Sequence, residues 1–406
     1  MNFAKQTLVV AMGTGGAQLI MLVATPWLAR AYTPFAFGEF AVFQSVMMAL
    51  VTVSCLRYEM AIPVEKRPEQ ANLLSVLSIL SVLVVAFLSL GATVAIQYGV
   101  LPFNLGSLGP SLIYIPAAIL FSGLFQVTTF LGIREGNFLH TGMFKVGQAI
   151  FFVVSALLLG GLGLVGAYAF SFAFAAISLL RYIGNISAFS FRDLLGVAKR
   201  YKEYPLLSMP TALLDTLALA APVLIISEYY STTDTGNFSQ VQRLISAPLL
   251  LLSMAISQVF FKHASEYRHS GKLLVPLMVR AIRILGVAGI TLWLTAAAIG
   301  NPLLRLILGS EWRTDTAFIL LAITPIVIRV MVSPVSNIFM VCDRVRLGTM
   351  WQVFHFAAAF GVLPIAAKRM GFDNFLLVIV VSDLVLYTLY GTLALRVARQ
   401  ADGEIR

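Results

Sequence analysis

The sequence predicts an all-α polytopic membrane protein with about twelve transmembrane helices, arranged as two six-helix bundles related by pseudo-two-fold symmetry. Of its 406 residues, 59% are hydrophobic and only 11% are charged, and the mean hydropathy of +0.90 lies far above that of a soluble globular domain. Apolar stretches of about 20 residues, the length that crosses the hydrocarbon core as a helix, recur along the whole chain. A short motif near the start of the chain also recurs at the middle.

Twelve stretches have the length and polarity of membrane-crossing helices. They are 7–29, 38–60, 71–97, 108–131, 142–160, 163–182, 207–229, 236–261, 280–300, 315–341, 347–367 and 373–396. The first stretch has no small-residue cleavage site after a short apolar core, so we expect it to be retained rather than removed as a signal peptide.

The distribution of positive charge predicts the orientation in the membrane. The net charge is +10, which in a soluble protein would suggest a nucleic-acid partner. Here twenty of the 28 Lys and Arg residues lie in the termini and in the loops after even-numbered spans, and five lie in the loops after odd-numbered spans. Because cytoplasmic loops carry the excess of Lys and Arg, both termini are predicted to be cytoplasmic, and no nucleic-acid partner is expected.

The repeated motif indicates two halves of the same orientation. Tyr32, Thr33, Gly38, Phe40 and Gln44 recur at the same spacing as Tyr230, Ser231, Gly236, Phe238 and Gln242. Six spans separate the copies, and an even number returns the chain to the same side, as in transporters built from parallel repeats. We expect the glycines to let the backbone turn between two spans and the phenylalanines to lie at interface depth. A chance match in a biased composition is the alternative.

Three parts follow from this plan: an N-terminal six-helix lobe (1–183), a basic cytoplasmic linker (184–205) and a C-terminal six-helix lobe (206–406). The apolar and basic residues of the linker predict a helix that lies on the anionic inner leaflet. Its alternative roles are a surface linker and a guide for the entry of a lipid substrate. Its apolar positions are Phe189, Phe191, Leu194, Leu195 and Val197, and its basic positions are Arg192, Lys199, Arg200 and Lys202.

Several kinds of chemistry find no support in the sequence. External loops of about 4 to 14 residues leave no room for an extracytoplasmic catalytic domain. There is no GxxxxGK[ST] phosphate loop, and none of the four histidines has a partner at zinc-ligand spacing. We therefore expect no enzymatic activity, no metal and no other cofactor.

Charged residues inside the predicted spans are the strongest candidates for function, because they are costly in lipid and normally face a cavity or a partner. Asp215, Arg329 and Asp383 lie deep in their spans. Ser333, Ser336 and Asn337 follow Arg329 at helical spacing, which predicts one polar face. The alternative for Arg329 is a structural ion pair with Asp215 or Asp383.

Polar stripes on three other spans extend this hypothesis to a wet central cavity. They are Thr7, Thr14, Gln18 and Thr25 in the first span, Ser208, Thr211 and Asp215 in the seventh, and Ser239, Arg243, Ser246, Ser253 and Ser257 in the eighth. Arg57 and Glu59 end the second span, where they either form a gate or simply pair with each other.

Two runs carry a resemblance to a known family. TPWLARAYTPFAFGEFAVFQS and LRYEMAIPVEKRPEQANLLSVLS, together with the twelve-span plan and the basic linker, resemble the Wzx-type flippases. These belong to the polysaccharide transporter branch of the multidrug/oligosaccharidyl-lipid/polysaccharide (MOP) exporter superfamily. The resemblance covers most of the chain in plan and is specific mainly over residues 20–80.

The resemblance implies a bilobed, MATE-like alternating-access carrier in the bacterial inner membrane. Its cargo would be an undecaprenyl-pyrophosphate-linked glycan, flipped for O-antigen or exopolysaccharide biosynthesis. The family's cavity is cationic, and the positions here that match or could line it are Arg329, Arg243, Arg57, Gln18, Gln44, Ser333 and Asn337. Candidates for coupling to H+ or Na+ are Asp215, Asp383 and Glu59. A polysaccharide polymerase and chain-length machinery are the expected protein partners.

Three other functions stay open at this stage. One is a multidrug or cation antiporter of the same superfamily, which an acidic cavity would favour. A membrane enzyme such as an O-antigen polymerase would need a long periplasmic loop. A scaffold for the glycan machinery would need no transport pathway.

The charge asymmetry generates the first testable prediction. A cysteine placed at Lys199 should react only with reagents that reach the cytoplasm, and one placed at Asp234 should react from the periplasm. Labelling of intact cells and of inverted vesicles measures this. Periplasmic labelling at Lys199 would overturn the predicted orientation.

Overall fold

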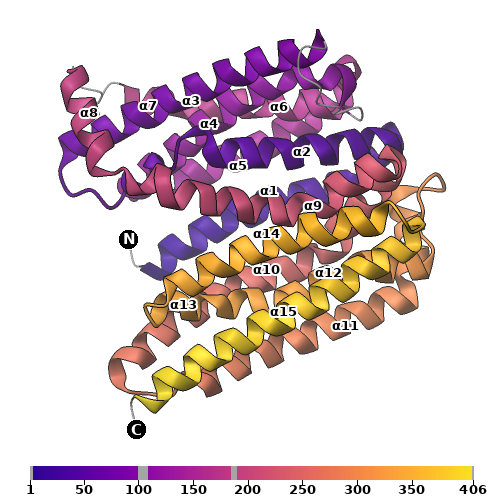
Figure 1. Cartoon of the computed structure of the whole chain (residues 1–406). Coiled ribbons are helices and arrows are strands. Elements are labelled where there is room, and N and C mark those ends of the chain that lie inside the picture. Colours follow the sequence, from indigo (N-terminus) through magenta and orange to yellow (C-terminus); the bar gives the residue numbers. More distant parts are fainter. Residues whose placement is uncertain (1–2, 99–107, 184–189, 405–406) are drawn as a thin grey trace. The chain divides into compact units, whose positions relative to one another are not determined.

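The structure is a computed structural model that describes residues 3–98, 108–183 and 190–404, the side chains of 3–12 and 183 excepted. Within these residues every regular element is helical (Figure 1). The α-helices are α1 (Phe3–Ala31), α2 (Pro34–Ser54), α3 (Pro68–Gln97), α4 (Tyr114–Arg134), α5 (Phe138–Leu158), α6 (Gly163–Ala176), α7 (Leu180–Ile183), α8 (Phe191–Arg200), α9 (Met209–Tyr229), α10 (Thr232–Ser270), α11 (Leu274–Leu308), α12 (Thr316–Val332), α13 (Ile338–Val341), α14 (Val345–Ala367) and α15 (Phe372–Gly403). The predictions that involve the side chains of Lys5 and Thr7, the segment 184–189 and Arg406 lie outside the described residues.

The all-helical, multi-pass prediction is confirmed. In the described part of the chain, eleven helices are long and apolar enough to cross a membrane, and they correspond to the second to twelfth predicted spans. Helix α1, 29 residues long, covers the first predicted span, although its opening side chains lie outside the description. Helices α10 and α11 run on beyond their apolar stretches to 39 and 35 residues, because a span predicted from hydropathy ends where polarity begins and a helix need not.

The chain divides into two compact units, Met1–Ala220 and Ala221–Arg406. This boundary falls inside α9, two residues before Pro222. The sequence places the boundary earlier, with a linker at 184–205 and the C-terminal lobe from 206, and that division into lobes stays a prediction.

In the first unit, glycines let helices pack in close contact. Helix α1 lies along α5, and α4 lies between α3 and α6. A β-carbon added at Gly13 would meet the Cα of Gly142 at 2.5 Å, so the two backbones touch where α1 crosses α5. Gly123 on α4 admits Val82 of α3 in the same way, at 2.8 Å. Small residues at such crossings are what helix association in a membrane requires.

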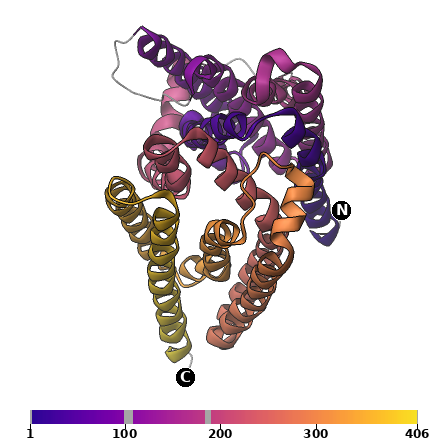
Figure 2. The ribbon, with the colours of Figure 1, turned by 90° about the vertical axis from the view of Figure 1, so that its right-hand side faces the viewer.

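In the second unit, α10, α11 and α12 pack against one another and α12 packs against α15; Figure 2 gives a second view of these helices, in the salmon-to-yellow part of the colour scale. The two carboxylate oxygens of Asp402, near the end of α15, accept from the backbone N–H groups of Leu274 (2.6 Å) and Val275 (3.0 Å). Asp402 thereby satisfies two of the unpaired donors at the start of α11. These hydrogen bonds connect the C-terminal end of α15 to the N-terminal end of α11.

The motif repeat corresponds to a repeated structural device. Thr33 is the N-cap of α2, its hydroxyl accepting from Ala36 N at 3.3 Å, and Ser231 is the N-cap of α10, its hydroxyl accepting from Asp234 N at 2.9 Å. The tyrosine before each cap reaches the end of the fifth span of its own half. Tyr32 donates to the carbonyl of Ala156 at 2.6 Å, and Tyr230 donates to that of Met370 at 2.9 Å.

The role predicted for the glycine of the motif was wrong, whereas the interface depth predicted for the phenylalanine stays a prediction. Gly38 and Gly236 are each the fifth residue of their helix and are buried there, so the capping residue, rather than the glycine, makes the turn. Phe40 and Phe238 are 1% and 0% exposed. They are core residues, because a helix that starts in a bundle buries one face within its first two turns.

The predicted amphipathic helix forms as α8. Ser190 and Asp193 form a capping box at its N-terminus. Its Leu194 and Val197 are buried and the helix packs on α3, so part of the apolar face assigned to lipid is covered by protein. Phe191 and Leu195 stay exposed.

The end of α8 is attached to the α2–α3 connection. Arg200 donates to the side-chain carbonyl of Gln70 at 2.7 Å, and the hydroxyl of Tyr201 donates to Glu65. The pKa of the Glu65 carboxyl is lowered from its usual value, chiefly by the backbone N–H of Arg67 and also by this hydroxyl. Both donors stabilise the ionised carboxylate, so the attachment is strongest when Glu65 is charged.

Lys145 is a basic residue whose placement differs from the sequence prediction. Lys145, counted with a cytoplasmic loop, is the eighth residue of α5 and is half-buried. Its ammonium lies 3.2 Å from the hydroxyl of Thr14 on α1.

The repeated tyrosine contacts predict matched losses of stability. Tyr32→Phe and Tyr230→Phe each remove a hydroxyl hydrogen bond, which should lower the free energy of unfolding by about 1 kcal/mol. Tyr98→Phe is the control, since Tyr98 is 82% exposed. Thermal unfolding in detergent compares the three variants, and equal stability of all three would contradict the tethering role.

Candidate functional site

The clearest charged site is an ion pair between α12 and α15. Arg329 donates through Nε to Asp383 Oδ2 at 2.6 Å and through Nη2 to Oδ1 at 3.2 Å. The two side chains are 17% and 5% exposed. Of the alternatives that the sequence left open for Arg329, the structure shows the pair with Asp383.

A cluster of aromatic side chains begins beside this pair. The guanidinium of Arg329 lies 6.0 Å from the ring centre of Tyr387, one turn along α15 from Asp383. Tyr390 stacks on Trp351 of α14 at 4.4 Å, and His355, 2% exposed, stacks on the same indole at 6.1 Å. Such apolar walls weaken screening, so the charge pair interacts more strongly than it would in water.

The predicted polar stripe after Arg329 is not one continuous helix face. Helix α12 ends at Val332 and residues Ser333–Asn337 form a 3₁₀ turn before α13. Pro334 explains the break, because proline has no N–H to donate into the helix ladder. With three residues per turn, Ser333 and Ser336 lie above one another, and Asn337 turns toward α10 to donate to Ser257 at 2.9 Å.

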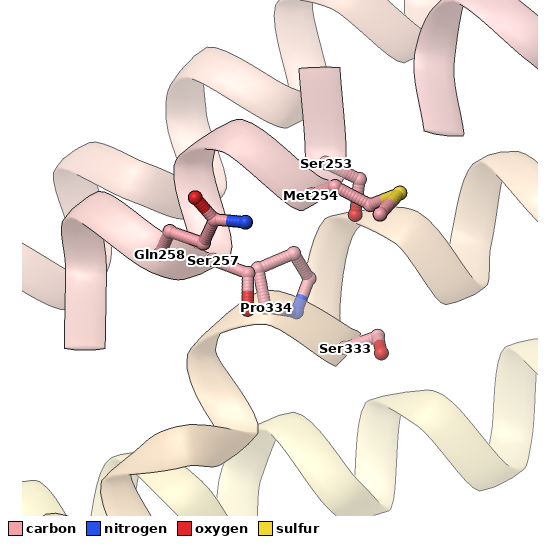
Figure 3. Close-up of a pocket in the computed structure, with 6 residues that line it drawn as sticks. All are labelled: Ser253, Met254, Ser257, Gln258, Ser333 and Pro334. Atoms are coloured by element: carbon pink, nitrogen blue, oxygen red, sulfur yellow. The ribbon is translucent and has the colours of Figure 1, made fainter. Parts of the chain in front are cut away.

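A pocket of about 300 Å³ opens at this break (Figure 3). The residues that line it come from α10 and the 3₁₀ turn: Ser253, Met254, Ser257, Gln258, Ser333 and Pro334. Three hydroxyls and an amide can exchange hydrogen bonds with a neutral polar group, and none of the lining residues carries a charge. Ser333 follows Arg329 by four residues along the chain and comes directly after the end of α12.

A second charged pair follows α2. Arg57 Nη1 lies 4.0 Å from Glu59 Oε1, so of the two alternatives left open by the sequence the structure shows a loose pair, and the gate role stays a prediction. Glu59 is fully buried in the 3₁₀ helix Tyr58–Ala61, and its Oε1 also accepts from the side-chain amide of Gln126 on α4 at 2.9 Å.

The other predicted site residues are distributed over several helices. Asp215 (α9), Arg243 (α10) and Gln44 (α2) are half-buried, and Gln18 (α1) is exposed. Their assignment to a cavity or to coupling stays a prediction.

Sequence reasoning missed three polar residues inside the bundles. Lys145 with Thr14 and Gln148 with Ser171 (2.7 Å) connect helices of the first unit, and Gln258 lines the pocket of the second. A search for single polar residues in apolar helices would have found Lys145 and Gln148. In the described residues, no group of three or more His, Cys, Asp or Glu side chains is placed to hold a metal ion.

Comparison with known proteins gives both a family and a fold. The model of the family described as polysaccharide biosynthesis protein matches residues 27–317. No curated protein sequence matches the chain significantly.

Solved structures resemble the chain over nearly its full length. The lipid II flippase MurJ in an inward closed conformation has a TM-score of 0.73 at 12% identity, covering 98% of this chain and 90% of that one. An inward-facing multidrug resistance MATE family transporter of the MOP superfamily has a TM-score of 0.72 at 14% identity, covering 96% and 95%. A MOP superfamily transporter from Pyrococcus furiosus, described by the reverse polarity of its binding pocket, has a TM-score of 0.65 at 15% identity, covering 99% and 95%.

At these identities the structural likeness shows the fold, and it is the fold of MOP superfamily transporters. The family match covers more than half of the residues, from before the Tyr32 motif to the start of α12. The chain therefore belongs to the polysaccharide biosynthesis protein family and is a multi-pass membrane protein with a transporter fold.

Proposed function

We propose that the protein flips an undecaprenyl-pyrophosphate-linked oligosaccharide across the bacterial inner membrane by alternating access, for O-antigen or exopolysaccharide biosynthesis. Membership of a polysaccharide biosynthesis family supports a glycan cargo. The fold shared with a lipid II flippase supports a lipid-linked one. The charge distribution of the loops supports cytoplasmic termini, which sets the direction from the inner to the outer leaflet.

The observation that carries this proposal is the two-point contact between Arg329 and Asp383. Arginine presents a planar fork of N–H groups that fits carboxylate and phosphate oxygens alike. Asp383 therefore holds Arg329 in the geometry that a pyrophosphate oxygen pair requires, and the substrate exchanges with the carboxylate.

The neutral pocket supports the glycan part of the cargo. Sugar hydroxyls need donors and acceptors without charge, and Ser253, Ser257, Gln258 and Ser333 offer both. One of its lining residues, Ser333, follows Arg329 by four residues, and the proposed cargo carries pyrophosphate and sugar side by side. Arg57 and Arg243 are the further anion contacts that we propose.

Coupling to H+ or Na+ is proposed at Asp215, with Asp383 and Glu59 as further candidates. A polysaccharide polymerase and chain-length machinery on the far side of the membrane are the proposed protein partners, because they would consume the flipped unit. No enzymatic step is proposed for the chain itself.

The ion pair provides the decisive test. Arg329→Ala leaves Asp383 buried and unpaired, which should cost about 3–5 kcal/mol of stability and abolish surface polysaccharide in a deletion strain. Arg329→Lys keeps the charge without the fork and should be partly active.

A double variant separates transport from folding. Arg329→Met combined with Asp383→Leu removes both charges, which is often neutral for stability, so the protein should reach the membrane at a normal level and export no glycan. Normal export by this double variant at normal level would refute the anion-exchange mechanism.

Asp215 tests the coupling proposal. Asp215→Asn keeps the side-chain shape and removes the charge, so the membrane level should stay normal and glycan export should fall. Asp343→Asn makes the same exchange at an exposed residue and is the control for non-specific effects. Full export by Asp215→Asn would dismiss a coupling role, and loss of the protein from the membrane would indicate a structural one.

A further inference from the structure

The connection from α2 to α3 begins with an unusual backbone. Leu56 and Arg57 are consecutive non-glycine residues with positive φ, 50° and 65°, a region that side chains with a β-carbon rarely adopt. Among the described residues, Asp343 is the only other non-glycine residue with a positive φ. Such conformations persist where the surrounding structure imposes them, and they concentrate at functional sites.

The charged groups held by this turn are incompletely satisfied. The 4.0 Å between Arg57 and Glu59 is too long for a hydrogen bond, in contrast to the 2.6 Å of the Arg329–Asp383 pair. Glu59 Oε2 and Arg57 Nε are buried and make no hydrogen bond. A buried carboxylate oxygen without a donor is costly in its charged form, so the site favours a proton on Glu59.

The surroundings add little else that is charged. The turn packs on α3 through Leu74 and on α4 beside Gln126, within an apolar cluster that includes Ile62. Cys55 and Tyr58 are its buried titratable neighbours.

Besides Arg57, the nearby cation is Arg134 at the end of α4, and its guanidinium is already hydrogen-bonded. Arg134 donates to the backbone carbonyls of Ile62 and Glu65. Burial raises the pKa of Glu59 to about 6, against smaller opposing effects of its own backbone N–H, Arg57 and Gln126. Glu59 lies between the membrane-capable helices α2 and α3.

We propose that Glu59 is a proton-binding site linked to anion binding at Arg57: a proton on Glu59 Oε2 releases the Arg57 guanidinium to a pyrophosphate, and the bound pyrophosphate holds that proton. The proposal rests on the proposed function, since it takes the pyrophosphate of the lipid-linked glycan as the anion. The physical basis is that carboxylate and pyrophosphate compete for one guanidinium. Linkage makes the effect reciprocal, so each bound anion takes up a proton from solution.

The test measures binding of inorganic pyrophosphate to purified protein between pH 6 and pH 8, by ligand-induced thermal stabilisation. Wild-type affinity should fall with rising pH more steeply than that of Glu59→Gln, which mimics the protonated carboxyl. The ratio of the two dissociation constants should change at least about tenfold over this range, since one proton per ligand gives about tenfold per pH unit. Taking the ratio cancels the titration of pyrophosphate itself.

Three further variants control the measurement. Glu65→Gln changes a carboxylate in the same connection and should keep the wild-type pH dependence. Glu59→Ala should behave as Glu59→Gln does, which protects the result if one of them unfolds. Arg57→Gln should weaken binding throughout the pH range.

The outcomes separate this inference from the proposed function. If pyrophosphate binds wild-type protein with the same pH dependence as Glu59→Gln, or if Glu59→Gln binds more weakly at pH 8, the proton linkage is wrong and the anion site stands. If neither protein binds pyrophosphate at any pH, the proposed pyrophosphate recognition itself is wrong.

Discussion

Charge neutralisation inside an apolar helix bundle is the constraint on which the second unit depends. The guanidinium of Arg329 on α12 would be costly in lipid unless it met an opposite charge or water. Asp383 on α15 supplies the opposite charge. That contact fixes the rotation of both helices and brings Tyr387 to the same level. The same fork that meets the carboxylate can meet a phosphate, so a structural necessity and a transport site can share one residue.

The break in α12 has a comparable double role. Pro334 has no N–H to donate into the helix ladder, and residues Ser333–Asn337 form a 3₁₀ turn there. Non-helical backbone at membrane depth is tolerated where it is covered by protein or lines a polar cavity. Both conditions are met, because Asn337 bonds to α10 and Ser333 lines the pocket.

The two charged pairs differ in how completely they are satisfied, and this difference separates their roles. Arg329 and Asp383 make two short hydrogen bonds, whereas Arg57 and Glu59 stand 4.0 Å apart on a strained turn, with one polar atom of each lacking a partner. The complete pair holds both side chains in one geometry through its two hydrogen bonds. An incomplete pair in an apolar cluster changes protonation easily, because burial disfavours the carboxylate more than the distant cation favours it.

The sequence by itself determined the class of the protein, its helical spans and the repeat, because these depend on local composition, and apolar runs of sufficient length must become helices in a bilayer. It also identified the residues Arg329, Asp383, Arg57 and Glu59, because charge in an apolar run is visible without a structure. Only the tertiary structure decided that Arg329 meets Asp383, that Ser333 faces a pocket with Ser253, and that Gly38 lies in a helix while Thr33 makes the turn. These outcomes depend on which helix faces lie together and on backbone angles at single residues, and neither follows from the periodicity of one helix.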